Sequence, residues 1–141
     1  QLNARQKNIE IEANLQNSNY IVYADLAMME RVIQNLLENA IKYTPSNEKI
    51  RIQLDEKAKE LMVSITNTGV GIPENDLPNI FDRYYKISEP LSNDSGTGLG
   101  LAIVKNILEL HNSFINVNSK IKEFTTFYFQ LPLYNEKMEA Q

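Results

Sequence analysis

The sequence predicts one α+β domain built as a layered sandwich of strands and helices. Short segments alternate apolar and polar residues as strands do, and two longer segments repeat apolar residues at helical spacing. These segments do not follow one another as strand–helix–strand units, which favours a layered α+β arrangement. With 141 residues, 43% of them hydrophobic, the chain is long enough to bury one core without disulfides.

The first part of the chain is expected to contain two strands and one long helix. Asp25 is a candidate N-cap for the helix, and Thr44-Pro45 ends it. The two strands, which are short and half-buried by their alternation, are expected to pair with each other. In chain order, the elements are a linker or the end of a preceding helix over 1–8, a strand over 9–12, its partner over 20–23, and a helix over 26–43.

The rest of the domain, which ends at residue 134, is expected to hold four strands and two helices. Pro73 suits the first turn of the shorter helix, and a polar stretch with Pro90 and no periodicity indicates a mobile loop. In chain order, the elements are strands over 50–54 and 61–66 around a charged turn, a short helix over 73–81, the loop over 86–95, a helix over 99–110, strands over 114–117 and 125–131, and a flexible tail over 135–141.

Composition excludes several classes of site. The chain has no cysteine and one histidine, which excludes disulfide frameworks and ordinary zinc sites and favours a reducing compartment. A net charge of -4 argues against a nucleic-acid or anionic-membrane surface. No apolar run reaches the roughly 18 residues of a membrane span, so we expect this piece to be soluble and any membrane anchor to lie outside it.

All five glycines lie in two short clusters. Gly69 and Gly71 belong to the first, and Gly96, Gly98 and Gly100 to the second, which runs directly into an apolar helical pattern. Glycine lets main-chain N–H groups approach a ligand, and a helix N-terminus suits an anion. The clusters therefore indicate a phosphate-bearing ligand. Taken alone, the first is also compatible with a tight turn, and the second lacks the Gly-Lys-Ser/Thr ending of a P-loop.

The long helix has a second, polar face that includes Asn35, Asn39 and Lys42. Asparagine has a low propensity for the middle of a helix because its side chain competes for backbone hydrogen bonds. Two asparagines one turn apart therefore indicate a specific role. One interpretation is that their carbonyl oxygens bind Mg²⁺ while Lys42 meets a phosphate. The alternative is an ordinary solvated face. The apolar face is expected to consist of Leu26, Met29, Ile33, Leu36, Leu37 and Ala40.

Read in order, four motifs resemble the ATP-binding catalytic domain of sensor histidine kinases, within the superfamily shared with gyrase, chaperone and mismatch-repair ATPases. Residues 35–44, NLLENAIKYT, look like the N box, and residues 67–73, NTGVGIP, like the first glycine box. Residues 81–85, FDRYY, are similar to the F box, and residues 96–101, GTGLGL, to the second glycine box. The resemblance implies the Bergerat fold, a two-layer sandwich whose mixed, mostly antiparallel sheet is covered on one face by about three helices.

The resemblance also implies roles for individual residues around ATP and Mg²⁺. Asn39 would bind the metal, Asn35 and Lys42 would lie beside the phosphates, and Asn67 would receive the adenine amino group. Tyr43 would lie beside the base, and Ile72 belongs to the same glycine box. Gly69 and Gly71 would leave room for the nucleotide.

A second group of implied roles concerns the lid and the transferred phosphoryl group. The segment 83–95 would form the ATP lid, with Arg83 and Lys86 assisting the phosphoryl group. Main-chain N–H groups of the second glycine box would meet the phosphates. The residues implied there are Gly96, Thr97, Gly98, Leu99 and Gly100.

Three positions qualify the resemblance. The family's usual aspartate is Asn67 here. Its side-chain oxygen still accepts from an adenine N–H, but as a neutral acceptor it binds more weakly than a carboxylate, by about 1 kcal/mol. His111 is expected to end the last helix, with Asn112 in the left-handed position, rather than to accept phosphate. Tyr84 and Tyr85 are expected either to pack under the lid or to face the acceptor domain.

The implied function is transfer of the ATP γ-phosphoryl group to a histidine on a separate dimerisation domain, which is absent here. A response regulator downstream, a homodimeric full-length protein and a cytoplasmic position in a membrane-anchored bacterial sensor would follow, with no nucleic-acid or membrane contact by this domain. Two other classes stay open. An ATP-hydrolysing clamp would need a glutamate at the position of Asn35, and a nucleotide-binding pseudokinase is suggested by Asn67 alone.

Overall fold

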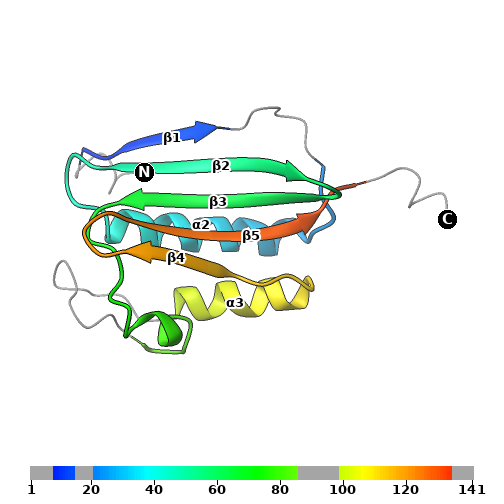
Figure 1. Ribbon diagram of the computed structural model, residues 1–141. Coiled ribbons are helices and arrows are strands. Elements are labelled where there is room, and N and C mark those ends of the chain that lie inside the picture. Colours follow the sequence, from blue (N-terminus) through cyan, green and yellow to red (C-terminus); the bar gives the residue numbers. More distant parts are fainter. Residues whose placement is uncertain (1–7, 15–20, 86–98, 135–141) are drawn as a thin grey trace.

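Five strands form one mixed sheet in the computed structural model, which describes residues 8–14, 21–85 and 99–134 (Figure 1). Their order across the sheet is β1-β2-β3-β5-β4. β1 pairs with β2 in parallel, and every other pair is antiparallel. The predicted mixed, mostly antiparallel sheet is confirmed. The strands are β1 (Glu10–Asn14), β2 (Lys49–Lys57), β3 (Glu60–Thr68), β4 (Asn116–Lys120) and β5 (Phe124–Pro132).

Helix α2 (Leu26–Lys42) lies against the sheet, as Figure 1 shows, and begins and ends where the sequence predicts. The Asp25 side chain accepts a hydrogen bond from the N–H of Met28 at 2.9 Å, which is the contact of an N-cap. At the other end, Tyr43 is the C-cap, and Pro45 follows at a position that cannot continue the helix. The buried side is formed by Val32, Leu36, Ala40 and Ile41.

Helix α3 (Gly100–Leu110) packs beside α2, and the two helices share one core with the strands. The C-terminus of α3 is tied to the start of α2 by His111, whose Nε2 accepts from the N–H of Asp25 at 3.0 Å. Because Nε2 accepts, Nδ1 carries the proton and donates to the carbonyl of Ile107 at 2.8 Å. Asn112 has a φ of 57°, the predicted left-handed conformation. His111 is therefore a structural residue at a helix end, as expected.

The core lies between the helices and the face of the sheet that carries alternate residues of β3 and β5. Leu61, Val63 and Ile65 on β3 are buried on this face. The opposite face of the same strands is polar or half-buried, which is the alternation expected of an antiparallel sheet with one covered side. Other buried members of the core are Val32, Leu36, Val104, Leu108, Phe127, Phe129 and Leu131.

Three sequence predictions about the fold are wrong in detail. The segment around Val22 does not pair with β1; it forms a single bridge with Leu133 at the end of β5, while β1 pairs with β2. Leu26 is 76% exposed because it starts the helix beyond the edge of the core. The helix expected over 73–81 is one turn of 3₁₀ helix, Leu77–Asn79, since Pro78 has no N–H for an α-helical bond.

No helix in the described part of the chain is long and apolar enough to cross a membrane.

Strands β2 and β3 are longer than predicted, and the turn between them is correspondingly tighter, with Ala58 at a φ of 55°. The linker, loop and tail predicted over 1–8, 86–95 and 135–141 lie, except for Asn8, outside the described residues.

Candidate functional site

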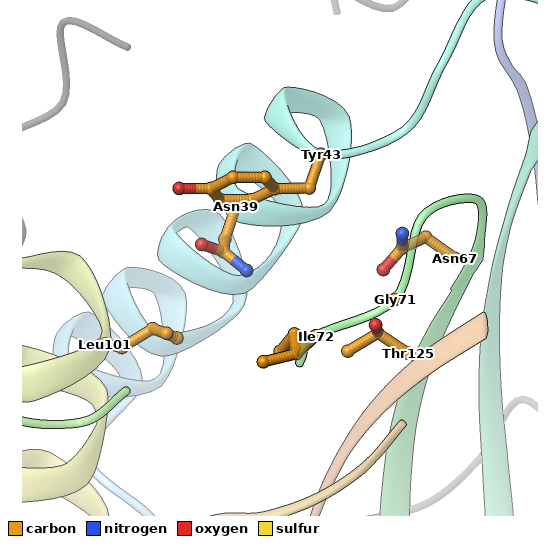
Figure 2. A pocket seen from close by; sticks show the side chains of 7 residues that line it. All are labelled: Asn39, Tyr43, Asn67, Gly71, Ile72, Leu101 and Thr125. Carbon is orange, nitrogen blue, oxygen red and sulfur yellow. The ribbon is translucent and has the colours of Figure 1, made fainter. Parts of the chain in front are cut away.

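A pocket opens between the C-terminal half of α2, the ends of β3 and β5 nearest to it, and the first turn of α3 (Figure 2). Its space measures about 320 Å³, part of which is open to solvent. The lining residues are Asn39, Tyr43, Asn67, Gly71, Ile72, Leu101 and Thr125.

The helix contributes Asn39 and Tyr43, which lie one turn apart and face the same space in Figure 2. The ammonium group of Lys42 lies 5.4 Å from the centre of the Tyr43 ring, within the range of a cation–π contact. Asn35, one turn before Asn39, is half-buried and makes a long 3.5 Å contact from Nδ2 to the carbonyl of Gly100. The asparagines of this helix therefore do not lie on a fully solvated face.

The strands contribute a buried polar pair. Asn67 on β3 and Thr125 on β5 are direct partners in the sheet register, and each is 4% exposed. The Thr125 hydroxyl lies 2.8 Å from the hydroxyl of Ser119, which also accepts from the N–H of Ile72 at 2.8 Å. Because this network runs under the loop after β3, it fixes that loop at the floor of the pocket.

The two glycines of this loop have a packing role that differs from the one implied by the sequence. A Cβ on Gly69 would lie 2.7 Å from Cδ of Pro45, and a Cβ on Gly71 would lie 2.5 Å from the carbonyl oxygen of Lys120. Both glycines also have positive φ, of 147° and 72°. Packing therefore requires both glycines independently of any ligand, because Gly69 lies against the ring of Pro45 and Gly71 lies against the backbone of Lys120 and Ile121.

The second glycine box lies only partly within the described residues. Leu99 is the N-cap of α3, Gly100 is the first helical residue, and no side chain caps this end. A Cβ on Gly100 would meet nothing within 4 Å, so neither packing nor conformation requires glycine there. The predicted residues Gly96, Thr97 and Gly98 lie outside the described part, as does Lys86.

The F box anchors the chain beside the pocket and separates the roles of its two tyrosines. Phe81 packs edge-on against Phe127 of the core, with ring centres 6.0 Å apart. The Tyr85 hydroxyl donates to the buried carboxylate of Asp76, and this bond, together with burial, raises the pKa of Tyr85. Tyr84 is 69% exposed. Arg83 is also exposed and does not line the pocket.

The structure thus brings together five of the predicted residues, Asn39, Tyr43, Asn67, Gly71 and Ile72, and adds two that sequence reasoning missed. Leu101 is the last residue of the second glycine box, so this motif could have indicated that it lies near the site. Thr125 reaches the pocket only through the pairing of β5 with β3, which no local pattern of the sequence shows.

The sequence pattern that defines the histidine kinase-, DNA gyrase B-, and HSP90-like ATPases matches residues 24–135 of this chain. The match includes both helices and every strand except β1. The chain belongs to this ATPase family. The pocket lies between the N box and the first glycine box of this ATPase domain.

Relatives of this ATPase domain are sensor kinases. Over 127 residues, 89% of the chain, it is 39% identical to the sensor protein KdpD of Clostridium acetobutylicum, of which it covers 14%. The mycobacterial sensor histidine kinase MprB has the same fold, with a TM-score of 0.82 at 27% identity over 94% of this chain and 89% of that one. The structure of histidine kinase ThkA in complex with response regulator protein TrrA matches this chain with a TM-score of 0.76 at 30% identity. The match covers 95% of this chain and 37% of that one.

Proposed function

We propose that this domain binds ATP with Mg²⁺ and transfers the γ-phosphoryl group to a histidine on a separate dimerisation domain of a two-component sensor kinase. The observation that carries the proposal is the pocket, in which Asn39 of the N box faces Asn67 of the first glycine box (Figure 2). Its sensor-kinase relatives support transfer to histidine as the reaction. Such chemistry depends on positioning and charge stabilisation more than on a covalent protein group.

The two ends of the pocket suit the two ends of a nucleotide. Asn67 offers hydrogen bonds, and the nearby Tyr43 and Ile72 offer apolar surface, which fits a purine base. The first turn of α3 lies at the other side, where Leu101 lines the pocket. A helix N-terminus without a side-chain cap presents N–H groups to an anion. We assign the phosphates to this side, close to Asn39.

Asn39 fits the role of the magnesium ligand. Within the described residues, no group of three or more histidine, cysteine or acidic side chains could hold a metal by protein ligands alone. Mg²⁺ commonly keeps several waters and takes one or two protein oxygens together with substrate phosphates, so one amide oxygen beside a nucleotide is sufficient. When bound, the ion would neutralise charge on the phosphates.

The surroundings of Asn35 argue against a hydrolytic clamp. An amide cannot take a proton from water, and the amide nitrogen of Asn35 is directed to the carbonyl of Gly100. Glu38 is exposed and does not line the pocket. We therefore expect the isolated domain to hydrolyse ATP slowly, because no Asp, Glu or His among the described residues lines the pocket to act as a general base, and His111 is held at a helix end.

Partners follow from the same proposal. The chain spans only a small part of its curated relatives, so the dimerisation domain would belong to the remainder of a longer homodimeric protein. The complex of ThkA with TrrA supports a response regulator as the downstream partner. We propose that the domain works in the cytoplasm of a bacterium, as part of a membrane-anchored sensor.

Calorimetric titration of the chain with a non-hydrolysable ATP analogue, with and without Mg²⁺, tests the proposal. Asn39→Ala should weaken binding by about tenfold or more and abolish its dependence on Mg²⁺, because the amide oxygen is lost. Gln34→Ala, which removes an exposed amide from the same helix, is the matched control and should bind like the unaltered chain. If the unaltered chain fails to bind at millimolar nucleotide, the proposal is wrong.

A further inference from the structure

Asn67 is the one residue of the first glycine box that departs from the family pattern, and its surroundings make the departure chemically meaningful. The residue is 4% exposed, and its amide is directed toward the space between α2 and the strands (Figure 2). Within residues 8–14, 21–85 and 99–134, its side chain makes no hydrogen bond. Asn67 lines the pocket, and its amide is not among the fully buried polar groups left without a partner, so a ligand that enters the pocket can reach it.

The neighbouring hydroxyl of Thr125 can only accept from a ligand. Ser119 has one hydroxyl proton, and it donates that proton to the carbonyl of Phe124 at 2.9 Å. The 2.8 Å contact between the Ser119 and Thr125 hydroxyls is then made with the Thr125 proton. Thr125 therefore offers only lone pairs to the pocket. On the wall of the pocket formed by Asn67 and Thr125, the Asn67 amide is the group that can donate a hydrogen bond to a ligand.

This arrangement changes which purines the wall can recognise. A carboxylate at position 67 would only accept, so it would suit the 6-amino group of adenine and repel a 6-oxo oxygen. An amide both donates and accepts. It pairs with the amino group and N1 of adenine in one orientation, and with the oxo group and N1–H of a 6-oxopurine when rotated by half a turn. No described neighbour holds the amide in one of these orientations.

We propose that Asn67 allows this pocket to bind 6-oxopurine nucleoside triphosphates as well as ATP. The inference rests on the proposed nucleotide site and specifies its ligand class. Inosine triphosphate is the sharpest probe, since it differs from ATP only in the oxo group and the proton on N1. The two nucleotides therefore test the contact at position 67 without changing the sugar or phosphates.

The experiment is a calorimetric or fluorescence competition measurement of ATP and inosine triphosphate, both with Mg²⁺, on the chain and on Asn67→Asp. The unaltered chain should bind the two within about tenfold of each other. Asn67→Asp should bind ATP more tightly and inosine triphosphate more weakly, because the oxo group of the latter would face a carboxylate. The ratio of the two dissociation constants should therefore widen by roughly ten- to a hundredfold. Asn118→Asp adds the same charge on an exposed residue of β4 and should leave the ratio unchanged.

The outcomes separate this inference from the proposed function. Binding of ATP with inosine triphosphate weaker by more than a hundredfold overturns the inference and leaves the nucleotide site standing. Binding of neither nucleotide overturns both. If Asn67→Asp fails to fold, as thermal unfolding will show, Asn67→Ala replaces it and should weaken both nucleotides alike. Unchanged binding of both to Asn67→Ala would also overturn the inference.

Discussion

Replacing Gly71 with alanine should destabilise the domain by about 1.5 to 3.5 kcal/mol. Gly71 has a φ of 72°, where alanine costs about 1–2 kcal/mol. The added Cβ would lie 2.5 Å from the Lys120 oxygen and 2.9 Å from Cα of Ile121. Since both are backbone atoms, no side-chain rotation relieves the contact. The β4–β5 turn must move, which strains the 2.8 Å bond from Lys122 N–H to the Val70 carbonyl, worth about 0.5–1.5 kcal/mol.

Urea denaturation followed by circular dichroism measures this loss, and Gly100→Ala is the matched control. Gly100 begins α3, and an added Cβ there meets nothing within 4 Å. The control should be neutral or stabilised by up to about 1 kcal/mol, because alanine favours helices over glycine. A loss below about 1 kcal/mol for Gly71→Ala, with an unchanged slope against urea, would refute the argument from backbone contact.

Two further predictions concern the second glycine box and the F box. Gly100→Ala should weaken binding of the ATP analogue by roughly tenfold although the variant stays folded and stable, because the added methyl group would occupy space that the phosphates need. Unchanged affinity in calorimetry would show that the phosphates do not approach Gly100. The pKa of Tyr85 is raised in the folded state by the bond to Asp76, so its contribution to stability is complete below about pH 10 and is lost as the pH rises further. The urea midpoint should therefore fall more between pH 8 and about 10.5 in the unaltered chain than in Tyr85→Phe, and parallel profiles would contradict this.

The elements that sequence reasoning placed well are those specified by neighbouring residues. The bounds of α2 depend on an Asp25 cap, an apolar repeat and a proline, and all of these act within a few residues. Pro73 suits a first helical turn and so predicts a helix over 73–81, but Pro78 lacks the N–H that an α-helix needs there, and the chain forms only a 3₁₀ turn. The wrong partner for β1 has a different cause, since pairing is decided between segments far apart in the chain.

The candidate site divides in the same way. The motifs placed Asn39, Tyr43 and Asn67 in one site, and the pocket brings these three together. They could not show Thr125, which lies opposite Asn67 only because β5 pairs with β3 in a particular register. Nor could they show that Gly71 is needed against the β4–β5 turn.

The sequence by itself determined the family, the two helices and the chemistry of the residues that face the pocket, because motifs and helical periodicity are local properties of the chain. Only the tertiary structure decided that the Asn67 side chain lines the pocket without a hydrogen-bond partner in the described residues and that the Thr125 hydroxyl donates its proton to Ser119. Those two facts depend on strand register and on which hydroxyl donates to which carbonyl. Both are set when distant segments pack together.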